Sequence, residues 1–305
     1  RELSRPLCLF TLPVEKKHRR LQEMQWSSKI ILINYGGKSM TDPISKEQSE
    51  YLNQIQRKKY WIRVAQVLLL LLLLFAWETA VSKNILNGFI FSSPSRIIRC
   101  FYGMVIDHSI FLHIGVTLAE TLVSFALITL FSVLIATILW WFPTAARIID
   151  PYLVVLNSLP KSALAPILIV WLGNNMKTII ITAISIAVFG SILNLYSGFL
   201  HVDKERLTLI RTLGGTKKDC LTMAVIPSCI PLLLSIMNVN IGLSLVGVII
   251  GEFLAARSGL GYLIIYGSQV FKMDWVLMSI VILCIIAMLL YALTGFIKKM
   301  YQRKI

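Results

Sequence analysis

The chain has 305 residues, of which 56% are hydrophobic and 15% are charged. Soluble domains carry about a quarter charged residues, so this composition excludes an ordinary soluble protein and predicts an all-α polytopic membrane protein. The formal net charge is +15, but Lys and Arg cluster beside the apolar runs, which indicates helix orientation rather than nucleic-acid binding.

Residues 1–39 carry mixed charge and show neither helical nor strand periodicity. Their short apolar run lacks the cleavage site of a signal peptide. Gly37-Lys38-Ser39 resembles the end of a phosphate-binding loop, but Leu32 stands where that motif needs Gly and no βαβ unit follows. A purine-rich ribosome-binding site can encode the two glycines and Lys38 just before Met40. We therefore expect translation to start at Met40, with residues 1–39 an upstream, disordered segment.

Six apolar stretches follow, each about the length that crosses a bilayer as a helix. They form a predicted membrane domain of residues 62–300, preceded by a polar, helix-prone segment (40–61) and followed by a short tail (301–305). The third and fifth stretches contain prolines, which kink helices and require neighbours to satisfy freed backbone groups, so we expect both inside the bundle. The predicted spans are 62–81, 117–142, 152–172, 178–200, 223–254 and 276–297, and the prolines are Pro160, Pro166, Pro227 and Pro231.

The distribution of basic residues predicts the orientation of the spans. Most Lys and Arg residues outside the N-terminal segment lie before the first span, between the fourth and fifth, and after the sixth. With six spans these segments share one side of the membrane, which the positive-inside rule assigns to the cytoplasm. The segment 83–113 falls on the other side although it contains Arg96 and Arg99. We expect both termini in the cytoplasm.

The segment between the fourth and fifth spans, residues 201–222, is charged and patterned. Leu207, Ile210 and Leu213 fall on one stripe of a short helix predicted over residues 201–213. Such a helix on the membrane surface suits a groove on another protein, or it rests on lipid headgroups. Composition leaves these two interpretations open.

A turn and a second helix start are predicted next. Gly214 and Gly215 stop the short helix and permit a sharp turn. Thr216 is the expected N-cap of the next helix, with Asp219 three residues on as the acid of a capping box. That helix then enters the membrane toward Pro227.

Ordered motifs in this region resemble the cytoplasmic signature of binding-protein-dependent ABC importer permeases. Arg211-Thr-Leu-Gly214 is followed at the family's spacing by Val225-Ile-Pro227 and by Pro231. The family's Glu-Ala-Ala triplet is replaced here by Thr208-Leu209-Ile210. Glu205 is the candidate to supply the acid of the triplet instead, although its spacing from Gly214 differs from that in the family. Further segments resemble the sulfonate, taurine and nitrate permeases, over about residues 60–300. These segments are Phe91-Ser-Ser-Pro-Ser95, Asp150-Pro151, Leu159 to Pro166, Trp171-Leu-Gly173, Gly251-Glu252 and Ser258 to Leu263.

The resemblance implies a type I importer permease in a bacterial plasma membrane. Two such subunits, here most simply a homodimer, form the pore among membrane lipid. A cytoplasmic ATPase dimer uses ATP, and an extracytoplasmic solute-binding protein delivers the solute. The chain itself would bind no cofactor and perform no chemistry. The subfamily points to a small, often anionic solute such as a sulfonate, taurine or nitrate, or to a vitamin precursor. The residues expected to couple to the ATPase are Glu205, Thr208, Leu209, Ile210, Leu213, Gly214 and Gly215.

Polar residues inside the predicted spans are candidates for the translocation pathway, because they are expensive in a bilayer. Hydrogen bonding between helices is the alternative for each of them. Lys161 either faces a central pathway, where it would attract an anion, or extends toward headgroups. The candidates are Asn157, Lys161, Asn238, Asn240 and Ser244.

Two acidic residues lie near predicted span ends. Glu120 comes early in the second span and is either interfacial or functional. Glu252 ends the fifth span, and with Gly259 and Gly261 beyond it we expect part of an external gate. A solvated helix end is the alternative for Glu252.

Two other classes of function are less consistent with the sequence. An ion-coupled carrier or channel without an ATPase is the alternative transporter, but the proline breaks do not pair under a three-plus-three inversion. An enzyme is unsupported, because the four His residues show no H-E-x-x-H spacing and no G-x-S-x-G is present. The five scattered cysteines lack C-x-x-C spacing, so neither disulfides nor a metal site is indicated.

Overall fold

The computed structural model describes residues 46–302, so the predictions for residues 1–39 lie outside the described part. The chain divides into two units, residues 1–70 and 71–305, and helix α2 (Lys46–Ser82) crosses this division. The described residues are almost entirely helical and contain no strand. The remaining helices are α3 (Gly88–Phe91), α4 (Pro94–Ile106), α5 (Ser109–Trp141), α6 (Pro143–Ser158), α7 (Lys161–Leu172), α8 (Met176–Leu200), α9 (Lys204–Thr212), α10 (Lys217–Asp219), a π-helical turn (Cys220–Val225), α11 (Ile226–Ala255), α12 (Leu260–Gln269) and α13 (Met273–Gln302).

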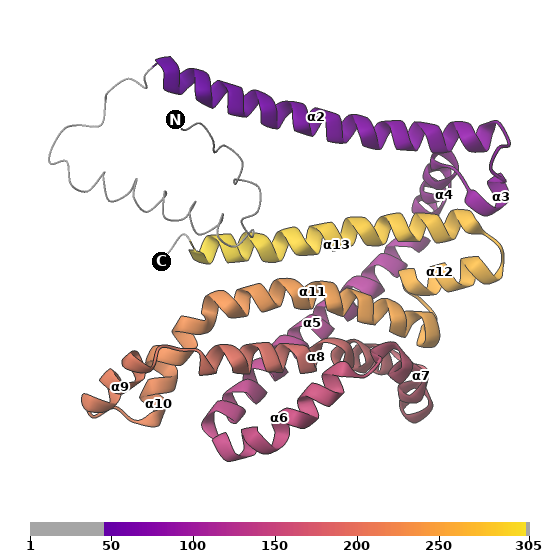
Figure 1. Cartoon of the computed structure of the whole chain (residues 1–305). Helices are drawn as coiled ribbons and strands as arrows, with labels where there is room; N and C mark the ends of the chain where they lie inside the picture. The colour runs from indigo at the N-terminus through magenta and orange to yellow at the C-terminus, as the bar shows by residue number, and fades with distance from the viewer. Residues whose placement is uncertain (1–45, 303–305) are drawn as a thin grey trace, which may run out of the picture. The chain divides into compact units, whose positions relative to one another are not determined.

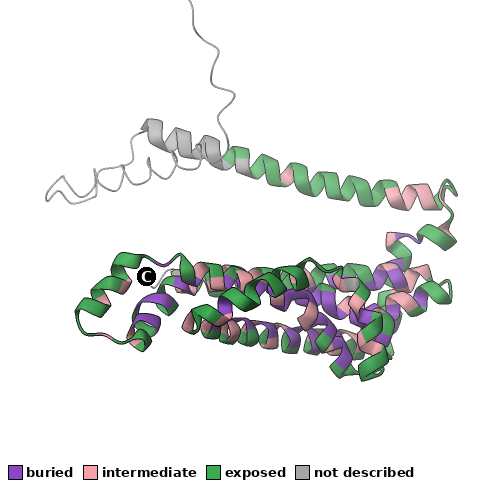
Figure 2. Ribbon diagram, turned by 60° about the horizontal axis from the view of Figure 1, so that its bottom comes forward, coloured by how far each residue is buried: buried purple, intermediate pink, exposed green. Residues whose placement is uncertain are grey.

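Helix α8 lies at the centre of the second unit, packed between α5 and α11 (Figure 1). Small residues bring α8 and α11 close together. A Cβ added at Gly247 of α11 would lie 2.6 Å from the Cα of Ala183, and one at Gly251 would lie 3.0 Å from the Cα of Ile179. Many residues of α8 and α11 are buried, and Figure 2 shows the buried segments in purple within the packed helices. Close backbone packing between α8 and α11 therefore organises the core.

Among residues 46–302, five helices are long and apolar enough to span a membrane, and a sixth span is present if α6 and α7 are counted together. The predicted third span is interrupted at Pro160, as expected, but the bend is far larger than a kink within one helix. The helical structure is interrupted between Ser158 and Lys161, and the axes of α6 and α7 are bent by 103° relative to each other. Leu159 is extended, because the ring of Pro160 disfavours helical backbone in the preceding residue.

The prolines of the fifth span have a milder effect than predicted. The helix continues from Lys217 to Ala255, and it passes through Pro231 without ending. A π-helical turn (Cys220–Val225) precedes Pro227. Such a turn widens the backbone and accommodates a proline ring that would clash with a carbonyl one turn earlier. The span therefore starts earlier than the predicted residue 223.

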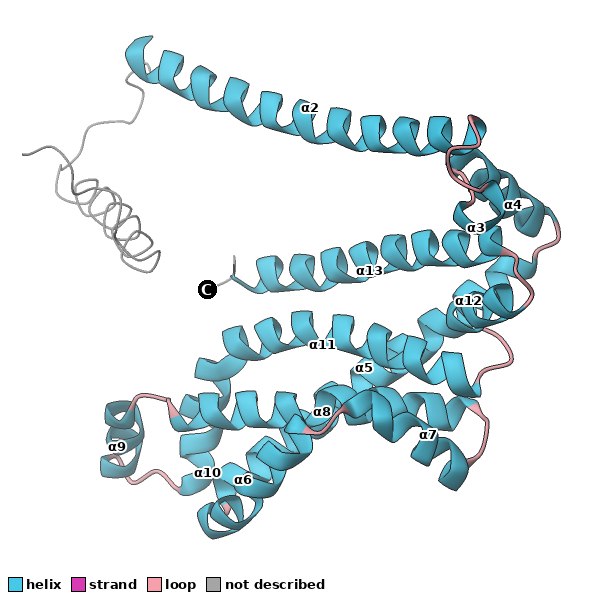
Figure 3. Ribbon diagram, turned by 45° about the vertical axis from the view of Figure 1, so that its right-hand side comes forward, coloured by secondary structure: helices cyan, strands magenta, loops and turns pink. Residues whose placement is uncertain are grey.

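Two groups of short elements lie at opposite ends of the second unit (Figure 3). Helices α9 and α10 follow α8 at one end, and α12 joins α11 to α13 at the other. Helix α5 starts at Ser109, eight residues before the predicted start at 117, and this places Glu120 about three turns inside the helix.

Candidate functional site

The α9 helix forms a short arm at one end of the second unit. Asp203 caps it by accepting a hydrogen bond from the Glu205 amide at 3.0 Å, and Arg211 in its last turn complements the helix dipole. Leu207 packs against a buried cluster that includes Phe199 and Val225. This contact fixes one face of α9 to the membrane helices.

The apolar stripe predicted on α9 is divided in the structure. Leu207 and Ile210 are half-buried against the protein, whereas Leu213 is 78% exposed and Leu209 is 59% exposed. Leu213 differs from the prediction because the helix ends at Thr212, so the i, i+3 periodicity does not extend to Leu213. The apolar surface that this arm offers to solvent thus consists of Leu209 and Leu213, and the polar residues Glu205 and Thr208 are among its exposed neighbours.

The turn after α9 has the geometry that its sequence predicts. Gly214 adopts φ +83°, which favours glycine, and the Gly215 amide donates to the Ile210 carbonyl at 2.8 Å. A Cβ on Gly215 would lie 2.5 Å from Cγ2 of Ile210. Thr216 and Asp219 form the predicted capping box, in which the Thr216 amide donates to the Asp219 carboxylate at 2.7 Å. The connection is therefore short and closely packed.

Lys217 joins this segment to a distant helix, which the sequence analysis did not predict. Its ammonium group donates to the carbonyl of Trp141 at 2.5 Å. It also lies 5.7 Å and 5.5 Å from the ring centroids of Trp140 and Trp141, within cation–π range. Two adjacent tryptophans at the end of an apolar span are the sequence feature that could have indicated this contact. We call α9, the Gly214–Gly215 turn and Thr216–Asp219 the coupling segment.

A polar cavity of about 280 Å³ lies where α6, α7, α8 and α11 meet. Lys161 donates to the Asn157 side-chain carbonyl at 3.1 Å. On the opposite wall, Ser191 donates to Oδ1 of Asn240 at 2.5 Å. This bond leaves Nδ2 of Asn240, which is buried and has no partner among the described residues, free to donate. The cavity is lined by Asn157, Lys161, Ile186, Ala187, Gly190, Ser191, Asn194, Leu232, Ser235, Ile236, Val239, Asn240 and Leu243.

Three of the five predicted pathway residues meet in this cavity: Asn157, Lys161 and Asn240. Asn238 and Ser244 do not line it. Asn238 lies two residues from Asn240, about 200° around the helix, and Ser244 donates its hydroxyl back to the Asn240 carbonyl at 2.7 Å.

Sequence reasoning missed three other polar lining residues, Ser191 and Asn194 of α8 and Ser235 of α11. The sequence feature that could have indicated the two α8 residues is a pair of polar side chains at i and i+3 in a largely apolar span.

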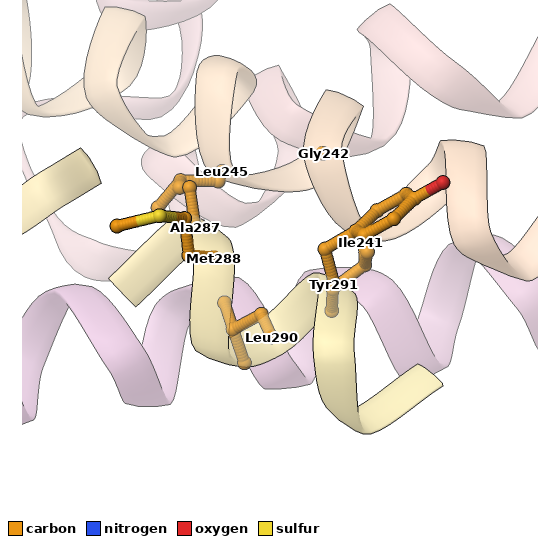
Figure 4. Close-up of a pocket in the computed structure, with 7 residues that line it drawn as sticks. All are labelled: Ile241, Gly242, Leu245, Ala287, Met288, Leu290 and Tyr291. Carbon is orange, nitrogen blue, oxygen red and sulfur yellow. The ribbon is translucent and has the colours of Figure 1, made fainter. Parts of the chain in front are cut away.

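A second hollow, of about 330 Å³, lies between α11 and α13 and has a different chemistry. Figure 4 shows that it is lined by apolar side chains, including the Met288 thioether, and that the Tyr291 hydroxyl supplies the side-chain oxygen. Its walls lack the hydrogen-bonding groups that a polar solute requires. The polar cavity is therefore the better candidate for solute contact.

The predicted gate residues Glu252, Gly259 and Gly261 come together at the opposite end of the unit. The Gly261 amide donates to Oε2 of Glu252 at 2.6 Å, and Thr117 of α5 donates to Oε1 at 2.6 Å. Glu252 is only 1% exposed, so the alternative of a solvated helix end is wrong. Glu120 is 2% exposed, so it is not interfacial either.

Comparison with known proteins identifies the family. The family model described as "Binding-protein-dependent transport system inner membrane component" matches residues 128–305, more than half of the chain. The chain belongs to this family. The expected permease assignment is thus confirmed, and this multi-pass protein is a membrane component of an ABC importer rather than an enzyme. Family membership implies ATPase and binding-protein partners and argues against the stand-alone carrier.

Curated relatives are similar over most of their length. The formylaminopyrimidine transport permease ThiX of Halalkalibacterium halodurans is 27% identical over 67% of this chain and 81% of that protein. The taurine transport permease TauC of Escherichia coli is 23% identical over 79% of this chain and 91% of that protein. The riboflavin transport permease RibX of Chloroflexus aurantiacus is 24% identical over 80% of this chain and 91% of that protein.

Solved structures confirm the fold. The inward-facing MetNI methionine ABC transporter aligns with a TM-score of 0.55 at 16% identity, covering 64% of this chain and 96% of that chain. An amino acid ABC transporter crystallised with histidines aligns with a TM-score of 0.52 at 16% identity, covering 67% of this chain and 98% of that chain.

Proposed function

We propose that the coupling segment of this permease docks on a cytoplasmic ATPase dimer and transmits ATP-driven closure to the membrane helices. The observation that carries this proposal is the two-sided attachment of the segment. Leu207 packs against the core, and Lys217 bonds to the end of α5. A short helix held in this way moves with the membrane helices as a unit, which a rigid-body transition requires. The exposed Leu209 and Leu213 are left to contact the ATPase.

The assembly that follows is a pore of two permease subunits, which we propose to be two copies of this chain. It lies in a bacterial plasma membrane with both termini in the cytoplasm, on the side of the coupling segment. ATP is bound by the ATPase subunits, and this chain binds no cofactor. An extracytoplasmic binding protein delivers the solute to the opposite face, where Glu252 and the Gly259–Gly261 turn form part of the gate.

The solute, in our proposal, is small and rich in hydrogen-bond acceptors, and it carries negative charge. The groups available at the polar cavity support this choice. Lys161 supplies an ammonium group and Asn240 supplies a free amide N–H, while the Asn157 and Asn240 carbonyls already have donors. Groups of this kind favour an anion's oxygens. The sulfonate group of taurine or of an aliphatic sulfonate fits these groups. Relatives of 22% and 23% identity are named for the transport of such solutes.

Co-purification tests the docking surface. We expect Leu213→Glu, extracted gently from native membranes, to lose the ABC ATPase that the unmodified chain retains, because the new charge falls on the proposed contact. The matched control is Ile85→Glu, which also replaces an exposed apolar side chain by glutamate but lies outside the coupling segment, at a position that is 73% exposed. Recovery of equal ATPase with Leu213→Glu and the unmodified chain would contradict the assignment of this surface.

A further inference from the structure

Two buried carboxyl groups face each other inside the helix bundle. Glu120 of α5 is 2% exposed and Glu252 of α11 is 1% exposed. Thr117 lies one turn before Glu120 on α5 and donates to Oε1 of Glu252 at 2.6 Å, which brings Glu252 to the face of α5 that carries Glu120. Two negative charges in contact are strongly unfavourable where water is excluded, so such pairs retain one proton.

The available donors determine which residue carries the proton. Both oxygens of Glu252 accept hydrogen bonds, from Thr117 and from the Gly261 amide, each at 2.6 Å. Glu120 differs, because its buried Oε2 meets no donor among the described residues. A proton on Glu120 converts this unsatisfied acceptor into a donor directed at Glu252. The arrangement therefore corresponds to a Glu252 carboxylate and a protonated Glu120.

The turn between α11 and α12 is shaped around the Glu252 carboxylate. A Cβ added at Gly259 would lie 2.3 Å from Oε1 of Glu252, and one at Gly261 would lie 2.7 Å from Oε2. Only glycine lets the backbone approach the carboxylate so closely. Thr117 extends the contact, because its hydroxyl accepts from the Leu260 amide at 2.8 Å. Helices α5, α11 and α12 are thus joined through one carboxylate.

Two ionisable residues lie beside the glycine turn that holds Glu252. His113 of α5 accepts a hydrogen bond from the Gly259 amide through Nδ1 at 3.0 Å, so that nitrogen carries no proton. Tyr262 of α12 stacks on the His113 ring at 6.2 Å between centroids. In the described part of the chain, no Lys or Arg forms an ion pair with either glutamate. The negative charge is therefore balanced by hydrogen bonds and by the shared proton.

We propose that Glu120 and Glu252 share one proton, and that this proton clamps α5, α11 and α12 together at the Gly-Leu-Gly turn. Loss of the proton to hydroxide in the surrounding water leaves two carboxylates in contact. Their repulsion loosens the turn, so the clamp weakens as the pH rises. This inference concerns a proton-binding site and does not depend on the docking of the coupling segment.

Infrared spectroscopy of the purified full-length chain tests the shared proton directly. We expect a protonated-carboxyl C=O band at pH 7.5, and we expect Glu120→Gln to remove it. The matched control, Glu205→Gln, changes an exposed glutamate and should leave the band in place. Absence of the band from the unmodified chain, or its persistence at full intensity in Glu120→Gln, would overturn the proposal.

Thermal unfolding across pH 6 to pH 10 tests the clamp. We expect the unmodified chain and Glu205→Gln to lose on the order of 5 °C more than Glu120→Gln between neutral and alkaline pH, because Gln has no proton to lose. A Glu120→Gln profile parallel to that of the unmodified chain would show that the pair does not hold the turn. Neither measurement involves ATPase or solute, so failure here leaves the proposed function untouched.

Discussion

The packing of α8 against α11 leads to a sharp prediction about two glycines on one helix. Gly247 lies against α8, where an added methyl group would sit 2.6 Å from the Ala183 backbone. Gly242 lies on the same helix with no atom within 4 Å of an added methyl group. The same substitution, glycine to alanine, therefore meets backbone at one site and open space at the other.

The magnitude follows from two opposing contributions. Replacing a helical glycine by alanine stabilises the helix by about 1 kcal/mol at either site. Overpacking at Gly247 costs about 1–3 kcal/mol, because the Ala183 backbone must move. We expect Gly242→Ala to be neutral or stabilising and Gly247→Ala to be less stable than it by about 1–3 kcal/mol. Since α8 and α11 both line the polar cavity, Gly247→Ala should also impair transport.

The assay is denaturant unfolding of the purified chain in mixed micelles, followed by tryptophan fluorescence and by circular dichroism. Coincident transitions by the two probes would justify comparing the two variants as free energies. Equal unfolding midpoints for Gly242→Ala and Gly247→Ala would refute the reasoning, because they would show that close α8–α11 packing does not limit side-chain size at Gly247.

Three further predictions concern the proposed sites. Lys217→Met removes the hydrogen bond to the Trp141 carbonyl and the cation–π contact. We expect the ATPase to stay bound to this variant while transport falls several-fold. Normal transport by the variant would argue against mechanical attachment of the coupling segment to α5. Lys161→Met should weaken uptake of taurine about 10-fold, an effect of about 1.4 kcal/mol, and Lys161→Arg should retain more activity. Equal uptake by the unmodified chain and both variants in reconstituted vesicles would exclude a charge contact with the solute. Thr216→Val removes the N-cap hydroxyl and should destabilise the coupling segment by about 1 kcal/mol, seen as faster amide exchange there, whereas Thr216→Ser should behave like the unmodified chain.

The sequence predicted the local features of the coupling segment well. The Gly214 turn and the Thr216–Asp219 capping box are confirmed, because each depends on backbone conformation and on partners within a few residues. The exposed position of Leu213 was not predicted. It depends on where the helix ends and on which side of α9 the other helices lie.

The candidate cavity was predicted only in part, because its lining also depends on how the helices face one another. Polarity within an apolar span marked Asn157, Lys161 and Asn240, but it marked Asn238 and Ser244 equally. Only the rotation of α11 about its axis decides which of its polar residues meets α8. Ser191 and Asn194 add to the cavity from a predicted span, residues 178–200, that contains no proline and no charged residue.

The sequence by itself determined the class of protein, five of its spans, the short helix, its turn and its cap. Those features follow from hydropathy, helical period and backbone preferences, which act over a few residues. Only the tertiary structure decided that Lys217 bonds to α5 and that Glu252 is buried against a glycine turn. Each of these depends on contacts between residues far apart in the chain, whose positions are set by the packing of α5, α8 and α11.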